Sequence, residues 1–331
     1  MPRRFKVVVT DFINDSFEIE KGVLGDLADI LGLEATTEEE LVGKIEDADA
    51  LIVYHVITIT EKTIARLESC KVISRGGVGF DNVDGSSARA RGIDVCNVPD
   101  YGTEEVADTA LGMTLALVRG IAFYNSRLRD ERDEWDYRQA VPLWRLRGRV
   151  FGIVGLGRIG TAAALRAKAL GMKVLYHDPY KPLGYDKSLG VTRVNALSDL
   201  LPQSHIVSLH CPLTEETRHL INATTLGEMR DGAYLINTAR GGVVDVSILP
   251  EALRCGKLAG AGIDVLETEP PNPDDPLIRA WRDPNHPAHD RLILTPHAAF
   301  YCEEGLAEIR RKGAENCRRA LLGEPVVNVV N

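Results

Sequence analysis

Short apolar segments alternate along the whole chain with longer segments that have helical spacing. The apolar segments cover residues 5–10, 50–54, 72–75, 93–96, 150–154, 173–177, 206–210, 233–237, 259–264 and 292–295. Runs that are apolar throughout are typical of strands buried on both faces of a parallel sheet. The alternation with helical segments therefore predicts an α/β fold with parallel sheets.

Helical spacing is clearest in residues 104–127, 197–201, 247–255 and 303–322. The first of these is predicted as one long helix. It has enough apolar surface for one face to pack inside the chain and another to meet a second subunit. The alternative is a core helix used wholly within one chain.

A break in the pattern precedes this long helix. Pro99 and Gly102 interrupt the apolar and helical spacing there, and proline lacks the amide that a helix or central strand needs. A chain of 331 residues also exceeds the size of one small core. We therefore predict two domains with a boundary near residue 100.

Composition narrows the class of protein. Hydrophobic residues at 44% and charged residues at 26% are typical of a soluble globular chain. A net charge of −9 argues against nucleic acid or an anionic membrane as the main partner. We see no signal peptide and no apolar run of the ~18 residues that span a bilayer. The six scattered cysteines have no metal-ligand spacing, so we expect reduced thiols in a cytoplasm.

A glycine fingerprint, Gly155-Leu-Gly-Arg-Ile-Gly160, follows the apolar run at 150–154 and opens a stretch rich in Ala and Leu. In such a strand, turn and helix, the first Gly permits the turn, the second lets a pyrophosphate approach, and the third allows close packing. The helix N-terminus then faces the phosphates. This context favours a dinucleotide site over a structural Gly turn.

An acid, Asp178, ends the next apolar run. At that place a carboxylate accepts hydrogen bonds from the adenosine ribose and repels a 2′-phosphate, which predicts NAD rather than NADP. Lys181 is close enough in sequence to weaken this preference. The structural alternative is a turn residue before Pro179.

Three residues with the chemistry of carbonyl reduction follow in order: Arg240, Glu269 and His297. A carboxylate beside an imidazole orients the ring and stabilises its protonated form, as a general acid requires. An arginine can bind a carboxylate through two parallel hydrogen bonds. Taken singly, each residue is more often structural, and spacing alone does not bring the three together.

The chain resembles the D-2-hydroxyacid dehydrogenase family over nearly its whole length. The motifs that carry the resemblance are Gly79-Phe-Asp-Asn-Val-Asp84, the fingerprint, His210-Cys-Pro-Leu-Thr214, Asn237-Thr-Ala-Arg-Gly-Gly242, Gly262-Ile-Asp-Val265 with Glu269-Pro270, and Thr295-Pro-His297. The resemblance implies two Rossmann-like domains, with an NAD-binding domain at 101–296 inserted into a discontinuous, flavodoxin-like catalytic domain at 1–100 and 297–331. A homodimer is also expected, mostly from this resemblance.

The resemblance also assigns roles to residues. His297 is implied as the acid/base, Glu269 as its partner and Arg240 as the cation that orients the substrate. The implied cofactor contacts are Val78, Thr109, Gly155, Gly157, Arg158, Ile159, Gly160, Asp178, His210, Cys211, Pro212, Thr217, Thr238, Ala239 and Asp264, the last for the nicotinamide carboxamide. The implied substrate contacts are Tyr54, His55, Arg75, Val78, Gly79, Arg240 and Phe300. For His55 a core position is an equally good interpretation, and Thr109 is a weak candidate.

Within the family the chain resembles the C-terminal-binding-protein branch, through 54–60, Arg75, 178–180 and 297–301. In place of the tryptophan that follows His-Ala-Ala in the animal corepressors, this chain has Phe300. Residues 279–290, with two histidines, have no counterpart there. We expect them to form a surface loop near the cleft, without a bound metal.

The first functional hypothesis is an NAD-dependent enzyme that interconverts a small 2-oxo acid and its D-2-hydroxy acid. The second is an NAD(H)-sensing, corepressor-like scaffold. The absence of a disordered tail after residue 331 argues against it. A phosphoglycerate dehydrogenase-type enzyme is a narrower alternative, which we rank lower because no C-terminal regulatory domain follows. The sequence does not name the substrate side chain.

Overall fold

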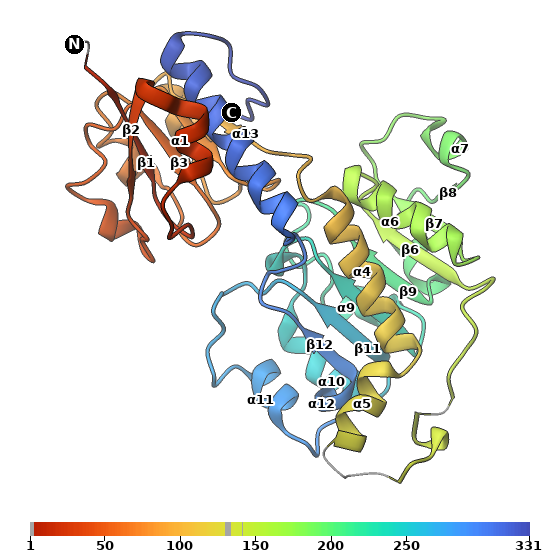
Figure 1. Cartoon of the computed structure of the whole chain (residues 1–331). Coiled ribbons are helices and arrows are strands. Elements are labelled where there is room, and N and C mark those ends of the chain that lie inside the picture. The colour runs from red at the N-terminus through yellow and green to blue at the C-terminus, as the bar shows by residue number, and fades with distance from the viewer. Residues whose placement is uncertain (1–2, 130–133, 141) are drawn as a thin grey trace. The chain divides into compact units, whose positions relative to one another are not determined.

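The computed structural model describes residues 3–129, 134–140 and 142–331. The chain divides into two compact units (Figure 1). Unit 1 comprises Met1–Gly102 and Tyr301–Asn331, and unit 2 comprises Thr103–Phe300. The chain thus leaves unit 1 once, completes unit 2 and returns through its C-terminal segment.

Unit 1 is built on a five-stranded parallel sheet in the order β2-β1-β3-β4-β5. Its strands are β1 Phe5–Val9, β2 Ala28–Gly32, β3 Ala50–Val53, β4 Val72–Arg75 and β5 Asp94–Asn97. Its α-helices are α1 Glu18–Leu24, α2 Glu61–Ile64, α3 Gly85–Ala90 and α13 Glu303–Leu322. This is the strand order of flavodoxin-like folds, in agreement with the predicted α/β class.

The C-terminal helix α13 packs against α1, β3 and β4 of unit 1. Arg310 on α13 bonds through Nε and Nη2 to the two carboxylate oxygens of Glu20 on α1, both at 2.7 Å. Glu20 is fully buried and Arg310 is 5% exposed. Asp15, half-exposed, accepts two more bonds from the same guanidinium. Arg310 therefore joins the last helix of the chain to the first.

Unit 2 is built on a seven-stranded parallel sheet in the order β12-β11-β10-β9-β6-β7-β8. Its strands are β6 Val150–Val154, β7 Lys173–His177, β8 Thr192–Arg193, β9 Ile206–Leu209, β10 Ala233–Asn237, β11 Leu258–Ile263 and β12 Leu292–Leu294. The strand order reverses between β6 and β9, which is the switch point where doubly wound sheets bind ligands. The unit therefore has Rossmann topology.

The α-helices of unit 2 are α4 Thr103–Val118, α5 Ile121–Arg129, α6 Arg158–Ala169, α7 Tyr185–Leu189, α8 Leu197–Leu200, α9 Ala223–Glu228, α10 Leu249–Arg254, α11 Pro276–Arg282 and α12 Ala288–Arg291. Helices α4 and α6 pack side by side, and α4 also contacts β10 and β11 (Figure 1). The side chains of α4 at Ala107, Ala110 and Leu117 are buried in this layer. Its apolar face is therefore used largely within the unit.

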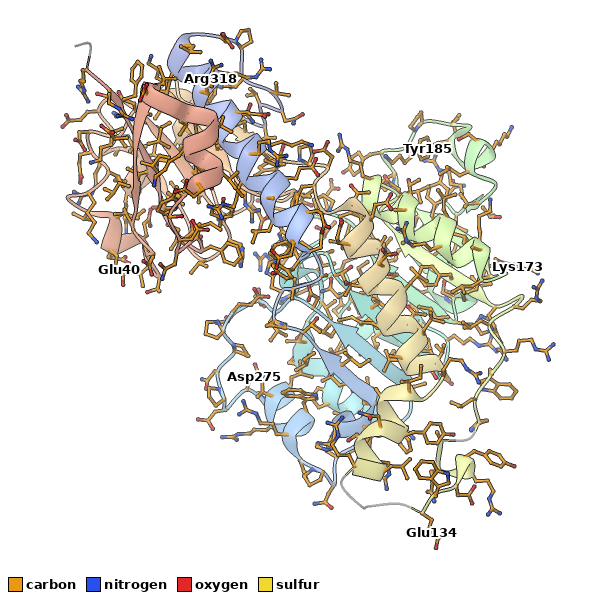
Figure 2. The ribbon with its side chains drawn as sticks, in the orientation of Figure 1. Glu40, Glu134, Lys173, Tyr185, Asp275 and Arg318 are labelled. Atoms are coloured by element: carbon orange, nitrogen blue, oxygen red, sulfur yellow. The ribbon has the colours of Figure 1, made fainter. Side chains whose placement is uncertain are left out.

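Two elements differ from their predictions. The single helix at 104–127 is instead α4 and α5, with a bend of 62° between them. Gly120 in the break has φ +66°, a left-handed conformation that favours glycine. The loop predicted at 279–290 is wrong, because α11 is capped by Asp275 (Figure 2) and α12 follows it. Since α12 precedes β12, it lies at the amino-terminal edge of the sheet, away from the carboxyl edge.

Among the described residues, no single helix has the length and apolar character needed to cross a membrane. Helices α4 and α5 meet that criterion only as a bent pair. Within the same residues, no group of three or more His, Cys, Asp or Glu side chains gathers as a metal site would require.

Candidate active site

The glycine fingerprint forms the turn from β6 into α6. Gly155 has φ +87°, and a Cβ there would lie 2.7 Å from the amide nitrogen of Cys211. A Cβ on Gly160 would lie 2.1 Å from the carbonyl oxygen of Gly155. Gly157 is the N-cap of α6, and a Cβ on it would meet nothing within 4 Å. The first and third glycines are thus required by the fold, and the second leaves the helix N-terminus open to a phosphate.

Asp178 follows β7 and faces this turn. Its Oδ2 accepts a hydrogen bond from the amide of Leu156 at 2.8 Å, and its Oδ1 accepts one from the amide of Tyr180 at 3.0 Å. Asp178 therefore stabilises a turn, which was the structural alternative for this residue. It also places a carboxylate beside the glycine turn, where an adenosine ribose binds in such folds.

Two buried polar atoms at the ends of β9 and β10 mark a place for a ligand. Leu209 pairs with Asn237 in the sheet, so His210 and Thr238, which follow them, end neighbouring strands. The Nε2 of His210 bonds to the hydroxyl of Ser208 at 2.9 Å. Its Nδ1 and the Oγ1 of Thr238 have no partner among the described residues. Burial lowers the pKa of His210 to about 4, so the ring is neutral at physiological pH.

Asp264, at the end of β11, holds the segment that carries His297. Its carboxylate accepts the hydroxyl of Thr295 at 2.6 Å and the amides of Ala298 at 2.9 Å and Ala299 at 3.1 Å. The residue is 2% exposed. The sequence implied only a cofactor contact for Asp264. The structure shows a carboxylate already bonded to three donors of the catalytic segment.

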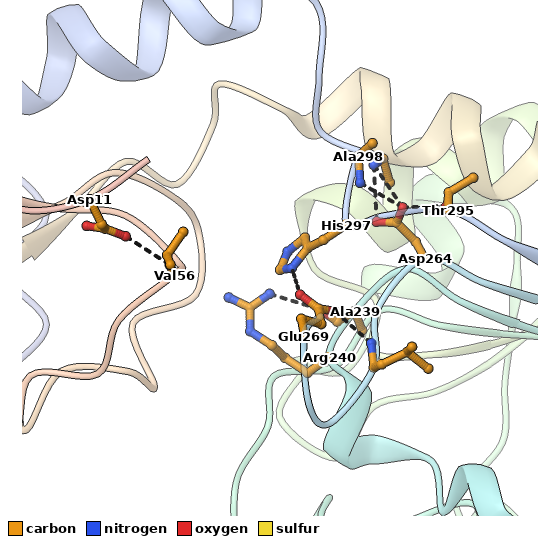
Figure 3. A network of polar contacts seen from close by, with 11 residues as sticks. Asp11, Val56, Ala239, Arg240, Asp264, Glu269, Thr295, His297 and Ala298 are labelled. Atoms are coloured by element: carbon orange, nitrogen blue, oxygen red, sulfur yellow. Dashed lines mark hydrogen bonds and ion pairs between the residues drawn. The ribbon is translucent and has the colours of Figure 1, made fainter. Parts of the chain in front are cut away.

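His297, Glu269 and Arg240 lie together (Figure 3). His297 Nδ1 is 2.8 Å from Glu269 Oε2, and the other oxygen of Glu269 accepts the amide of Leu266 at 2.7 Å. Both side chains are partly exposed, at 22% for His297 and 32% for Glu269. The imidazole is therefore oriented by a carboxylate that is itself held by the backbone.

Arg240 follows β10 at the same edge. Its Nη1 donates to the carbonyl of Ala239 at 2.9 Å, and its own carbonyl accepts from the side chain of the fully buried Asn237 at 2.9 Å. Phe300 places its ring edge-to-face with His297, with 6.3 Å between the ring centroids. Sequence reasoning did not find the role of Asn237, although it lies within a quoted motif.

The remaining cofactor candidates of unit 2 occupy loops and the helix that border this edge. Thr109 of α4 donates to the carbonyl of Ala299 at 3.3 Å rather than to its own helix. Thr217 donates to the carbonyl of Pro212 at 2.6 Å and so closes the 212–217 loop. Cys211 is buried against Gly155. The other candidates here, Arg158 and Ile159, begin α6.

The candidates in unit 1 follow the ends of β3 and β4. The Tyr54 ring is 1% exposed and packs against Phe12 at 5.4 Å between centroids, and burial raises its pKa. The Tyr54 ring therefore belongs to the core of unit 1. The ring of His55 lies 4.7 Å from that of Phe12. Arg75 is 5% exposed, and within the described ranges no acceptor bonds the amides of Val78 or Gly79.

Comparison with known proteins shows what the chain is similar to. A family model described as "D-isomer specific 2-hydroxyacid dehydrogenase, NAD binding domain" matches residues 111–299. The chain is 38% identical over 98% of its length to a D-3-phosphoglycerate dehydrogenase of Methanocaldococcus jannaschii, of which it spans 59%. It is 37% identical over 89% of its length to a glyoxylate reductase of Korarchaeum cryptofilum, of which it spans 86%. The structure of a D-lactate dehydrogenase from Aquifex aeolicus, complexed with NAD and lactic acid, is 31% identical, with 96% of each chain covered and a TM-score of 0.84.

Proposed function

The chain belongs to the D-isomer specific 2-hydroxyacid dehydrogenase family, and on this premise we propose that it reduces a small 2-oxo acid to its D-2-hydroxy acid, or catalyses the reverse reaction, with NAD. The observation that carries the proposal is the His297–Glu269 pair at 2.8 Å. It lies beside Arg240 at the carboxyl edge of the sheet that bears the glycine fingerprint. An acid/base, a cation and a dinucleotide turn are the groups that this reaction needs.

The residues of unit 2 fit NAD. The glycine turn leaves room for a pyrophosphate, Asp178 offers a carboxylate to the ribose, and the unpartnered atoms of His210 and Thr238 face a ligand position. When bound, NAD supplies or accepts a hydride at the substrate carbon. We propose that Asp178 favours NAD over NADP, because its negative charge repels a 2′-phosphate.

The proton is handled by His297. With Nδ1 bonded to Glu269, the Nε2 atom holds the proton that moves to the carbonyl oxygen in reduction and returns in oxidation. The Glu269 carboxylate stabilises the imidazolium and prevents the ring from turning, since its second oxygen is tied to Leu266. His297 and Glu269 thus act together in both the reduction and the oxidation.

Each unit offers donors that are suited to a carboxylate. The Arg240 guanidinium is suited to bind the carboxylate or polarise the carbonyl by parallel hydrogen bonds. The amides of Val78 and Gly79 form a backbone cradle suited to an anion, with Arg75 beside them. We propose that His55 and Phe300 limit the substrate side chain, so that small anionic 2-oxo acids fit.

A second candidate is a phosphoglycerate dehydrogenase-type activity. The 38% identity to the Methanocaldococcus jannaschii protein favours it. Its substrate carries a phosphate as well as a carboxylate, so it requires cationic groups beyond those that bind the acid. The scaffold hypothesis is supported by the sequence resemblance alone.

The first experiment follows NADH oxidation against glyoxylate, pyruvate, hydroxypyruvate, 3-phosphohydroxypyruvate and larger 2-oxo acids. We expect one small acid to be reduced efficiently, with activity lost in His297→Asn while NADH still binds. Preference for the phosphorylated acid would favour the second candidate. If none of these acids is reduced although NADH binds, the result would contradict the proposed enzyme activity and favour the scaffold hypothesis.

We also propose a homodimer in the cytoplasm. Exposed apolar side chains follow α4 in sequence: Ile121, Trp135, Tyr137 and Trp144 are each more than half exposed. A surface of this kind is suited to a second copy of the chain. The six cysteines are all free, which is typical of a reducing compartment. Sedimentation at micromolar concentration tests the dimer, and a monomer at all concentrations would exclude it.

A further inference from the structure

The loop that follows β3, residues 54–57, is held on its amide side by one buried carboxylate. Asp11 accepts the amide of Tyr54 at 2.8 Å through Oδ1 and the amide of Val56 at 2.9 Å through Oδ2 (Figure 3). It also accepts the hydroxyl of Thr10 at 2.7 Å. Asp11 is fully buried, so these donors bind the carboxylate without competition from water.

The same loop is held on its carbonyl side by one carboxamide. The Nδ2 of Asn82 donates to the carbonyls of Tyr54 and Ile57, both at 2.8 Å. Its Oδ1 accepts the Nε hydrogen of Arg75 at 3.2 Å. Asn82 thus joins the loop after β3 to the residue that ends β4. Only a carboxamide offers two donors and an acceptor in one planar group.

Arg75 in turn contacts the stretch of chain that leads to the amides of the substrate cradle. Its Nη1 donates to the carbonyl of Gly76 at 2.9 Å. A Cβ on Gly77 would lie 1.4 Å from that same Nη1, so the backbone passes directly over the guanidinium. The amides of Val78 and Gly79 come next along the chain.

We propose that Asn82 is a positioning residue for the substrate and acts together with Asp11. It fixes the loop that carries His55 and the guanidinium that supports the Val78–Gly79 cradle. This inference rests on the proposed function, because it takes those amides as the place of the substrate carboxylate. All the contacts that carry it lie within unit 1, whereas the glycine fingerprint lies in unit 2.

The test compares Asn82→Ala and Asn82→Asp with wild-type protein. The readouts are KM and kcat for the best 2-oxo acid, the affinity for oxamate by quenching of NADH fluorescence, and the affinity for NADH itself. We expect KM and the oxamate Kd to rise about tenfold or more, because the buried carbonyls of Tyr54 and Ile57 lose their donor. The NADH affinity should stay within about twofold, by the same reasoning, because no bond in unit 2 is removed.

Asn316→Ala is the matched control. Its Oδ1 accepts the amide of Val327 at 2.9 Å, it is 5% exposed, and its bond holds the C-terminal segment of unit 1 rather than the 54–57 loop. We expect it to lower the melting temperature without changing KM. A merely structural role for Asn82 would give the same pattern in Asn82→Ala, and that result would overturn the inference.

Arg75→Lys provides a second variant should Asn82→Ala fail to fold. It keeps the positive charge but has no Nε hydrogen to donate to Asn82, so KM and the oxamate Kd should again rise about tenfold. Unchanged values in this variant would also overturn the inference. Wild-type protein that neither reduces 2-oxo acids nor binds oxamate would instead remove the proposed function and the inference with it.

Discussion

The amide of His297 donates to the backbone carbonyl of Asp264 at 2.8 Å, while the Asp264 carboxylate binds the amides just after His297. His297 itself has φ +53°, a left-handed conformation that is rare for a residue with a side chain. His297 is thus held in an unusual backbone conformation by the residue that follows β11. Such outliers persist where the surrounding bonds over-determine them.

This relationship predicts that Asp264→Ala impairs catalysis through His297. The variant leaves one hydroxyl and two amides without their acceptor, at a cost of about 1–3 kcal/mol for each buried donor. We expect a lower melting temperature and a fall in kcat larger than any change in KM. Asp264→Asn keeps one acceptor oxygen, so its kcat and melting temperature should lie between those of wild type and Asp264→Ala. A kcat equal to wild type in Asp264→Ala would show that the segment holds its position unaided.

Glu269→Gln should lower kcat by about a hundredfold or more, because the imidazolium loses its counter-charge and its fixed orientation. The binding of NADH should not change, since Glu269 does not border the glycine turn. Glu267→Gln is the control two residues away. Glu267 is exposed, pairs with Arg218 and His219, and should be replaceable without loss. Equal losses in the two variants would assign the effect to the loop rather than to the pair.

Asp178→Ala should reduce the preference for NAD. A charged acceptor of two ribose hydroxyls contributes about 1.5–3 kcal/mol, so kcat/KM for NAD should fall about ten- to a hundredfold, with a smaller loss for NADP. Asp178→Asn removes the charge but keeps an acceptor oxygen for only one of the two amides, that of Leu156 or that of Tyr180. It therefore keeps part of the turn while it removes the repulsion of the 2′-phosphate. An unchanged ratio between cofactors in both variants would contradict the role.

The strands that the sequence revealed are those buried on both faces. Central strands such as β3 and β9 are buried at every residue, and they read as unbroken apolar runs. β2 was missed because it is an edge strand with alternating exposure and contains Asp29. The break at Gly120 was missed because α5 continues a helix-forming sequence, although none of its residues is buried.

The residues of the candidate site also divide into those that the sequence predicted and those that only the structure shows. Arg240, Glu269 and His297 were identified by residue type and family resemblance, and the structure brings them together. The supporting roles of Asn82 and Asp11 depend on side chains that reach the backbone of a loop 25 to 45 residues away in sequence. The hydrophobic periodicity of the sequence does not predict such a hydrogen bond, because the side chain and the loop backbone come close together only when the strands have formed. Hydrogen-bond partners of this kind can be read only from the folded chain.

The Arg310–Glu20 pair predicts a selective loss of stability in unit 1. Arg310→Met leaves the fully buried Glu20 carboxylate without its cation, which typically costs about 3–5 kcal/mol. In Arg310→Met, far-UV circular dichroism should show a transition at a lower temperature than in wild type. The transition followed by tryptophan fluorescence should not shift, since Trp135, Trp144 and Trp281 all lie in unit 2. Lys312→Met on the same helix removes only partly exposed pairs, with Asp100 and with Glu308, and should cost below about 1 kcal/mol.

His210 predicts how the stability of unit 2 depends on pH. Burial lowers the pKa of His210 from its usual 6.5 to about 4, so between these values the unfolded chain binds a proton that the folded chain does not. The free energy of unfolding should therefore fall as pH decreases from about 6.5 to about 4, by up to about 3 kcal/mol from this residue.

Urea unfolding followed by tryptophan fluorescence between pH 4 and pH 7.5 measures this effect in unit 2. His210→Asn should flatten the curve relative to wild type, because the titrating group is gone while the carboxylates remain. His205, whose pKa is also lowered to about 4 by burial and by Arg149 and Arg230, should contribute separately, so that His205→Asn removes a further part of the slope. Identical slopes in wild type and His210→Asn would mean that His210 accepts a proton in the folded unit, and the ring would then not be neutral at the nucleotide site.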